Sequence, residues 1–174
     1  YNVPSRTASY LEPETLIRLA ADPNIIGNKQ AVDFRSAGKH RDDTAKVIAA
    51  TKGLDFTTVS GEDDGVAAML ELGGSGVITA SGNIPEVAKI FLGIVAAHNA
   101  GDVAKARALQ ESALPFGKMG FCRKNPIPLA TFFNSPLFQP LVSVRETAGG
   151  EALHAEMMRF VSEKAPSLRK YQGK

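Results

Sequence analysis

The stretch Asn24-Ile25-Ile26-Gly27-Asn28-Lys29 decides the fold class, because its apolar run Ile25-Ile26-Gly27 is predicted to be a short buried strand in front of a lysine. A helix is predicted before it, over residues 13–21, where apolar side chains recur at helical spacing. A second helix is predicted after it, over residues 38–52. A short apolar strand between two helices is typical of a parallel sheet that helices cover.

The same alternation continues to about residue 100. Further strands are predicted over residues 56–59 and 77–79, the segment from Tyr1 reads as another strand end, and helices are predicted over 62–72 and 84–99. Beyond residue 100 the pattern predicts only helices, over 102–113, 126–133 and 150–164. The chain is therefore predicted to be an α/β protein, with the strands in residues 1–100 and a helical region in 101–174. Four parallel strands make either half of an eight-stranded barrel, which needs about 250 residues, or a small open sheet.

The composition is that of an ordinary soluble domain. The 174 residues carry 20 basic and 18 acidic side chains, and this near-neutral balance does not indicate binding to nucleic acid or to an anionic membrane. No apolar run approaches the roughly 18 residues of a membrane span. The single cysteine, Cys122, excludes an internal disulfide. The three histidines lie far apart, so a zinc site built from neighbouring ligands is not expected.

Three side chains near the amino terminus carry chemistry suited to a keto acid. Lys29 follows a strand, and parallel α/β folds place their active sites at the carboxyl ends of strands. Partial burial there raises the fraction of neutral amine, the form that attacks a carbonyl. Tyr1 could move protons, and Arg6 could bind a carboxylate through two parallel hydrogen bonds. Position alone leaves open a solvated lysine, a structural tyrosine and an arginine in a surface ion pair.

Two further motifs favour structural interpretations. The segment Ser60-Gly61-Glu62-Asp63-Asp64 offers carboxylates to a metal, but acids at a helix start are explained by the helix dipole, so no metal site is predicted. The run Gly73-Gly74-Ser75-Gly76 precedes a strand instead of opening a helix, which is the wrong context for a phosphate-binding loop.

Six segments, in their order along the chain, resemble the dihydrodipicolinate synthase family, within the pyruvate-dependent lyases that include N-acetylneuraminate lyase. The resemblance covers residues 1 to about 130. It is carried by Tyr1-Asn2-Val3-Pro4-Ser5-Arg6-Thr7, Pro13-Glu14-Thr15, residues 24–29, Ser60-Gly61, residues 74–79 and Asn125-Pro126-Ile127-Pro128.

The resemblance implies a (β/α)8 barrel followed by a small helical region, of which this chain would supply strands five to eight. It implies that Lys29 forms a Schiff base with pyruvate and that Tyr1 relays protons. Arg6 would bind the carboxylate of aspartate semialdehyde, Ile78 would contact pyruvate through its backbone, and Gly61 would line the floor of the site. The barrel's first four strands and its pyruvate-carboxylate loop would precede Tyr1, so the chain looks like a fragment.

The implied function is a lyase that condenses pyruvate with aspartate semialdehyde to 4-hydroxy-tetrahydrodipicolinate, in lysine and diaminopimelate biosynthesis. The resemblance implies no cofactor beyond the covalent imine with pyruvate on Lys29. It implies a cytoplasmic homo-oligomer, a tetramer, with small-molecule substrates and neither nucleic acid nor membrane as a partner.

Some residues depart from the family pattern, and together with the expected absence of the barrel's first four strands they keep two alternatives open. The family usually has glycine at Ala8, an aliphatic residue at Asn28 and glutamate at Gln30. The first alternative is a pyruvate-releasing aldolase of the same superfamily that acts on a sugar acid or keto acid. The second is an inactive half barrel that serves as a binding or assembly module.

Overall fold

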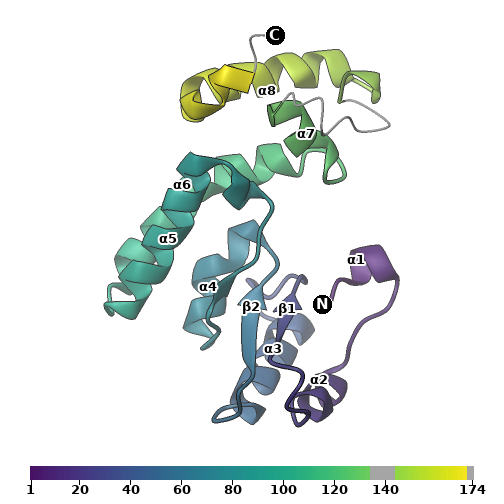
Figure 1. Ribbon diagram of the computed structural model, residues 1–174, viewed down its shortest axis with the longest axis vertical. Helices are drawn as coiled ribbons and strands as arrows, with labels where there is room; N and C mark the ends of the chain where they lie inside the picture. Colours follow the sequence, from purple (N-terminus) through teal and green to yellow (C-terminus); the bar gives the residue numbers. More distant parts are fainter. Residues whose placement is uncertain (134–143, 172–174) are drawn as a thin grey trace. The chain divides into compact units, whose positions relative to one another are not determined.

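The computed structural model describes residues 1–133 and 144–171 and divides the chain into two compact units. The first unit comprises Tyr1–Thr79 and Phe91–Glu111, and the second comprises Ala80–Ile90 and Ser112–Lys174. The long helices α5 (Pro85–Asn99) and α6 (Val103–Gly120) contribute to both units (Figure 1). The division into residues 1–100 and 101–174 stays a prediction about organisation.

A parallel sheet organises the first unit. Its strands β1 (Gly27–Gln30), β2 (Thr57–Ser60) and β3 (Gly76–Val77) follow one another in the order β1-β2-β3, and both pairings are parallel. Asn2 adds a parallel bridge to Gln30 on the other side of β1. The helical elements of this unit's amino-terminal part are α1 (Pro4–Thr7), α2 (Pro13–Leu19), α3 (Lys39–Ala50), η1 (Asp63–Gly65) and α4 (Val66–Glu71). The prediction of an α/β fold with a parallel sheet is confirmed.

The strand boundaries correct the sequence prediction. The predicted strand over residues 25–27 is wrong in its limits, because β1 begins at Gly27 and includes Lys29. Ile26 lies outside the ladder and is 66% exposed. The polar run from Gly27 to Gln30 is a strand because it pairs with β2 along its whole length. Asn28 and Gln30 are buried on one face of this strand, and Lys29 between them is half-buried on the other. An apolar run therefore indicated the strand but not its extent.

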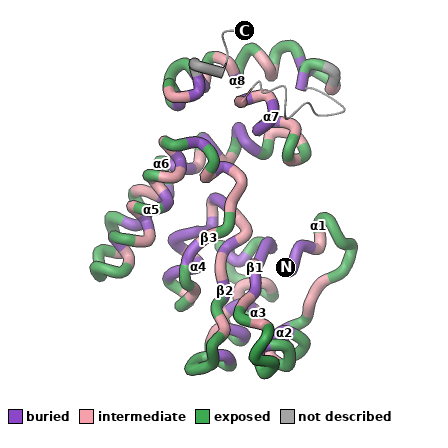
Figure 2. The backbone as a smooth tube through the Cα atoms, viewed as in Figure 1, coloured by how far each residue is buried: buried purple, intermediate pink, exposed green. Residues whose placement is uncertain are grey.

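The core of the first unit lies between the sheet and its helices. Val32, Phe34 and Met69 form a buried cluster, and Tyr10 and Ile48 pack against it. Figure 2 shows α4 largely buried, whereas α2 exposes most of its surface. This packing supports β1, which carries Lys29, and β2, which leads into Gly61.

The second unit is helical wherever it is described. It contains parts of α5 and α6 together with η2 (Ser81–Asn83), α7 (Ile127–Phe133), η4 (Val144–Glu146), α8 (Gly150–Lys164) and η5 (Pro166–Tyr171). The Phe160 ring meets Phe116 edge-on at 5.0 Å and stacks near Phe132 at 6.4 Å between centroids. Glu86 accepts hydrogen bonds from the amide and the hydroxyl of Ser167, which joins α5 to η5.

Helices account for the regular structure after residue 100, as predicted, across 101–133 and 144–171. One boundary differs, because α6 continues through Pro115 to Gly120 and exceeds the predicted helix over 102–113. Within the residues that the structure describes, no helix combines the length and the apolar character needed to cross a bilayer.

Candidate active site

The register of the sheet places four of the predicted site residues on one face. Gln30 pairs with Asn2 on one side and with Ser60 on the other, and Ser60 pairs with Val77. Side chains alternate along a strand, so the residues before and after this row point to the opposite face. Tyr1 and Lys29 therefore share one row of that face, and Gly61 and Ile78 share the next row.

Tyr1 and Lys29 are in direct contact. The Lys29 Nζ atom lies 4.4 Å from the centroid of the Tyr1 ring, a cation–π distance. Lys29 is half-buried and Tyr1 is 62% exposed. The structure thus brings the predicted nucleophile and the predicted proton relay together on an accessible face.

The strand that carries Lys29 is anchored from behind by polar side chains. Asn28 is 6% exposed and Gln30 is 1% exposed, both on the face opposite to Lys29. Gln30 Nε2 donates to Thr44 Oγ1 of α3 at 3.2 Å, and that hydroxyl donates to the His40 carbonyl at 2.6 Å. This link ties β1 to α3 and holds Lys29 on the open face. Asn28 Oδ1 is buried and has no hydrogen-bond partner among the described residues.

Gly61 and Ile78 stand where two neighbouring strands end. The Gly61 amide donates to the Gln30 carbonyl at 2.7 Å, and a Cβ atom on Gly61 would lie 2.6 Å from the Cβ of Ala31. Only glycine allows so close an approach. The Ile78 amide donates to the Ser60 carbonyl at 2.9 Å, and its side chain is 56% exposed. Their contact with a substrate stays a prediction.

Arg6 lies on α1, the short helix that follows Val3. The Val3 carbonyl accepts the amides of Arg6 at 2.9 Å and Thr7 at 3.1 Å, and Ala8 ends the helix in the left-handed region at φ 53°. The arginine side chain is exposed. Its role in binding a carboxylate stays a prediction.

An acidic loop after β2, which the sequence analysis interpreted as structural, holds a carboxyl group with a raised pKa. Ser60 Oγ accepts the Glu62 amide at 3.0 Å and donates to the Glu62 carbonyl at 2.7 Å, which shapes the turn. Burial, and then the charges of Asp64 and Asp63, raise the pKa of Glu62 above its ordinary 4.5, against the opposing effect of Arg35 and Lys29. The signal available in the sequence was the position of Glu62 directly after Gly61.

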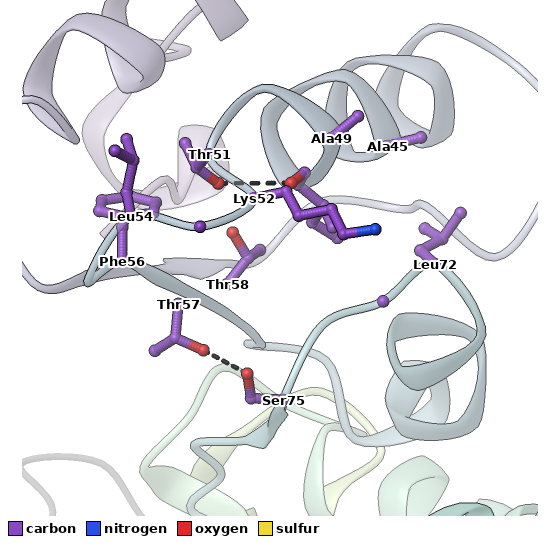
Figure 3. Close-up of a pocket in the computed structure, with 13 residues that line it drawn as sticks. Ala45, Ala49, Thr51, Lys52, Leu54, Phe56, Thr57, Thr58, Leu72 and Ser75 are labelled. Carbon is purple, nitrogen blue, oxygen red and sulfur yellow. Dashed lines mark hydrogen bonds between the residues drawn. The ribbon is translucent and has the colours of Figure 1, made fainter.

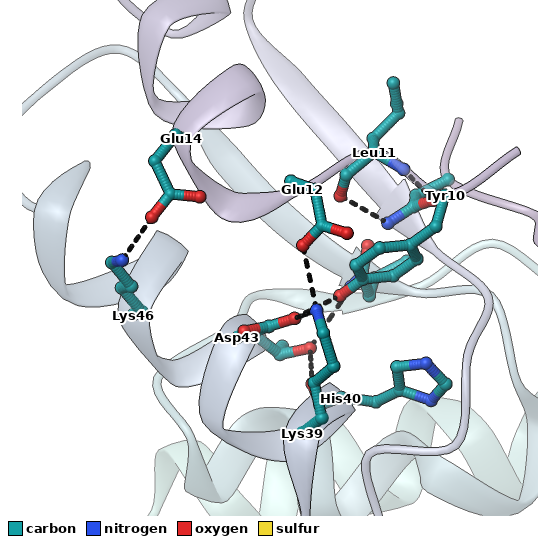
Figure 4. Close-up of polar contacts among 11 residues, drawn as sticks. Tyr10, Leu11, Glu12, Glu14, Lys39, His40, Asp43 and Lys46 are labelled. Atoms are coloured by element: carbon teal, nitrogen blue, oxygen red, sulfur yellow. Dashed lines mark hydrogen bonds and ion pairs between the residues drawn. The ribbon is translucent and has the colours of Figure 1, made fainter.

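A polar network holds the segment between α1 and α2 against α3 (Figure 4). The Tyr10 hydroxyl donates to Asp43 Oδ2 at 2.8 Å, and Lys39 Nζ donates to the same oxygen at 2.6 Å and to Glu12 Oε2 at 2.8 Å. The Lys39 ammonium also lies 4.6 Å from the centroid of the Tyr10 ring. Burial and the bond to Asp43 raise the pKa of Tyr10 far above its usual range. The network fixes the chain that leads away from Arg6.

A cavity of about 380 Å³ lies apart from these residues (Figure 3). Its walls include Ala45, Ala49 and Lys52 of the α3 region, Thr57 at the start of β2, and Leu72. Lys29 does not line it. No group of three or more histidine, cysteine, aspartate or glutamate side chains suited to a metal ion occurs in the described ranges.

Comparison with known proteins gives one consistent result. Residues 1–146 match the Dihydrodipicolinate synthetase family. The 4-hydroxy-tetrahydrodipicolinate synthase of Listeria innocua is 36% identical over 155 residues, which are 86% of this chain and 50% of the relative. The dihydrodipicolinate synthase structure from Thermotoga maritima shows 29% identity and a TM-score of 0.73, over 93% of this chain and 55% of that one.

A third relative is the chloride-inhibited dihydrodipicolinate synthase from Acinetobacter baumannii, whose structure was solved with pyruvate. It is 26% identical with a TM-score of 0.74, and the match covers 93% of this chain and 53% of the other. The chain thus spans about half the length of the relatives it matches, and its parallel sheet fits part of their barrel fold. The chain belongs to the dihydrodipicolinate synthetase family.

Proposed function

We propose that this chain is the segment carrying strands five to eight of a dihydrodipicolinate synthase, and that Lys29 is its imine-forming residue. The observation that carries the proposal is the contact of Lys29 Nζ with the Tyr1 ring at 4.4 Å on the accessible face of the sheet. A half-buried lysine beside a phenol offers a nucleophile and a proton carrier within reach of one carbonyl group. The pyruvate complex of the Acinetobacter baumannii relative supports a keto acid as the first substrate.

The proposed reaction uses the two residues in sequence. The neutral amine of Lys29 attacks the keto carbon of pyruvate, and the carbinolamine loses water to give the imine. Tyr1 moves the protons that this dehydration requires. Loss of a methyl proton gives the enamine, which attacks the aldehyde carbon of aspartate semialdehyde. Water then releases the condensed product from the lysine, so no cofactor or metal takes part.

Three further residues complete the proposed substrate contacts. Arg6 binds the carboxylate of aspartate semialdehyde from α1, where its side chain is exposed. The Ile78 carbonyl contacts pyruvate, while the Ile78 amide already donates a hydrogen bond to the Ser60 carbonyl. Gly61 lines the floor of the site, where the absence of a side chain lets β1 and β2 approach closely. The product then enters the lysine and diaminopimelate route, and the working protein is a cytoplasmic homo-oligomer.

The test is condensation of pyruvate with aspartate semialdehyde by the full-length protein that carries this segment. Lys29→Ala is expected to abolish turnover, because no other amine replaces the one that forms the imine. Lys52→Ala is the matched control, since this lysine lines the separate cavity, and it should retain turnover. Turnover by Lys29→Ala would contradict the assignment of the nucleophile.

A second candidate is a pyruvate-releasing aldolase for a sugar acid or keto acid. It is motivated by Asn28 and Gln30, which flank Lys29 with buried amides in place of the usual family residues. A panel of sugar acids and keto acids, assayed for pyruvate release, separates the two. Condensation without any release from the panel would exclude the aldolase.

A third candidate takes the 174 residues as an assembly module without activity. In the described residues β3 and the Asn2 bridge are the outer members of the sheet, so edges remain for a partner to cover. The isolated chain is expected to show little or no turnover. Turnover by the isolated chain at the rate of the full-length protein would exclude this candidate.

A further inference from the structure

We propose that Gln110 on α6 is a positioning residue of the candidate site, because its side-chain amide fixes the loop after β2 and, through Asp63 and Thr79, the end of β3. These two segments carry Gly61 and Ile78. The inference rests on the proposed function, in which the Ile78 carbonyl contacts pyruvate. In this scheme Gln110 touches no substrate and acts only through the backbone that it holds.

Gln110 contacts the loop after β2 from a distant part of the chain. Its Nε2 atom donates to the Asp63 carbonyl at 3.0 Å, and its Oε1 atom accepts the Ala67 amide at 3.1 Å. These partners lie 47 and 43 positions earlier in the sequence. All three residues belong to the first compact unit. One side chain therefore holds both the start of η1 and the start of α4.

The position of the two partners gives this contact its strength. Asp63 and Ala67 are four positions apart, the spacing of a carbonyl and an amide that bond within an α-helix. The Gln110 amide bonds to both groups at the point where η1 passes into α4. All three residues are buried. Loss of the Gln110 amide would leave a buried acceptor and a buried donor to find new partners, which costs free energy and displaces the loop.

Asp63 extends the restraint to the end of β3. Its carboxylate accepts a hydrogen bond from the Thr79 hydroxyl, and Thr79 is the residue after Ile78. The Ile78 amide donates to the Ser60 carbonyl at 2.9 Å, so the segment after β3 is bonded on both sides of the Ile78 carbonyl. Through Asp63, Gln110 therefore supports the backbone group that is proposed to meet pyruvate.

The proposed nucleophile is supported by a different contact. The bond from Gln30 to Thr44 ties β1 to α3, on the side of the sheet opposite to Lys29. The Gln110 amide bonds to the loop after β2 instead. Its removal is therefore expected to weaken the contact between pyruvate and Ile78 more than the attack by Lys29.

The first measurement needs no reaction. Amide hydrogen exchange is followed by mass spectrometry in the full-length protein that carries this segment, with and without Gln110→Met, which keeps the length of the side chain and removes both hydrogen bonds. Peptides that cover residues 61–67 and 77–79 are expected to exchange about tenfold faster in the variant. Unchanged exchange in these peptides would overturn the proposal.

Thr51→Val is the matched control. It also removes a buried hydrogen bond from a side chain to the backbone, from the Thr51 hydroxyl to the Val47 carbonyl at 2.9 Å, but this bond lies in the turn before β2. The control should leave exchange in both peptides as it is in the wild-type protein. Faster exchange there in Thr51→Val would mean that any loss of stability opens the strand ends, and this result would also overturn the proposal.

The second measurement is the steady-state condensation reaction of the same full-length protein, with pyruvate varied. Gln110→Met is expected to raise the KM for pyruvate about tenfold and to lower kcat less. Thr79→Val should raise the KM as well, and the double variant should add little to the larger single effect, because both changes break one chain of contacts. Thr51→Val should leave the KM unchanged.

The two measurements separate the positioning role from the proposed function. A normal KM for pyruvate in Gln110→Met, despite faster exchange, would mean that Gln110 is only structural and would overturn the proposal. A wild-type protein that condenses nothing would refute the proposed function, and the exchange measurement alone would then decide whether Gln110 holds the two strand ends.

Discussion

The two faces of the parallel sheet differ in what they carry and in how they are buried. The helix-facing side holds amides and hydroxyls, and Gln30, Ser60 and Thr58 are at most 4% exposed there. The other face holds Tyr1, Lys29 and Ile78, and it is open enough to leave Tyr1 62% exposed. An ordinary half-covered sheet would bury its apolar side chains and expose its polar ones.

The buried polar face supports the strands, and the open face carries the residues proposed for the chemistry. Buried polar groups are tolerated where hydrogen bonds satisfy them, and such bonds fix geometry more strictly than apolar contacts do. The Gln30–Thr44 bond ties β1 to α3, and β1 presents Lys29 on its other side. The polar face therefore orients the strand, and the open face is left free for a ligand.

The largest effect on stability is expected at Gly61, where the ends of β1 and β2 leave no room for a side chain. Gly61→Ala places a methyl group 2.6 Å from the Cβ of Ala31, so β1 and β2 must separate at their carboxyl ends. The free energy of unfolding in urea should fall by about 1–3 kcal/mol. Gly93→Ala is the control, because it lies inside α5 and meets only the flexible end of Leu109, so it should not destabilise. Equal losses in both variants would mean that the strand ends are not in close contact.

Two buried amides of the polar face can be compared directly. Asn28→Val removes a buried oxygen that has no hydrogen-bond partner among the described residues and a long bond of 3.5 Å from its Nδ2 to Gln30 Oε1, so stability should change by less than about 1 kcal/mol. Gln30→Met removes the bond to Thr44 and should cost about 1 kcal/mol. Thermal and urea unfolding measure both. Equal destabilisation would show that Asn28 contributes to the support as Gln30 does.

The smallest effect is expected in the loop that leads from the open face to Arg6. Ala8 adopts φ 53°, a left-handed conformation that glycine reaches without steric cost. Ala8→Gly should therefore raise the free energy of unfolding by up to about 1 kcal/mol. Ala96→Gly, at an exposed position within α5, should instead lose about 1 kcal/mol. A lower free energy of unfolding in both variants would mean that the backbone at Ala8 is not strained.

The sequence predicted the elements better than their limits. The helix over 150–164 agrees with α8 because its apolar spacing and its glycine start are local signals. The limits of β1 were missed because Asn28 and Gln30 look like loop residues until Thr44, 14 positions beyond Gln30, provides a partner for the buried amide. Sheet pairing and long-range hydrogen bonds are not local, so spacing along the chain does not contain them.

The candidate site shows the same limit. From position alone, structural roles explained Lys29 and Tyr1 better than catalytic ones. Their contact depends on the Asn2–Gln30 bridge. The resemblance to a family supplied the roles that spacing did not. From the sequence Glu62 had only a structural interpretation, because its raised pKa depends on burial and on charges from two loops, which only the folded chain brings together.

Mapping the pyruvate adduct tests directly whether the open face presents Lys29 as the imine-forming residue. The 174-residue chain is reduced with borohydride in the presence of pyruvate, digested, and every lysine peptide is measured by tandem mass spectrometry. If Lys29 forms the imine, the adduct concentrates on Lys29 and is absent from Lys39 and Lys46, whose ammonium groups are held in ion pairs. An adduct spread evenly over the lysines, or concentrated on a residue other than Lys29, would contradict this assignment.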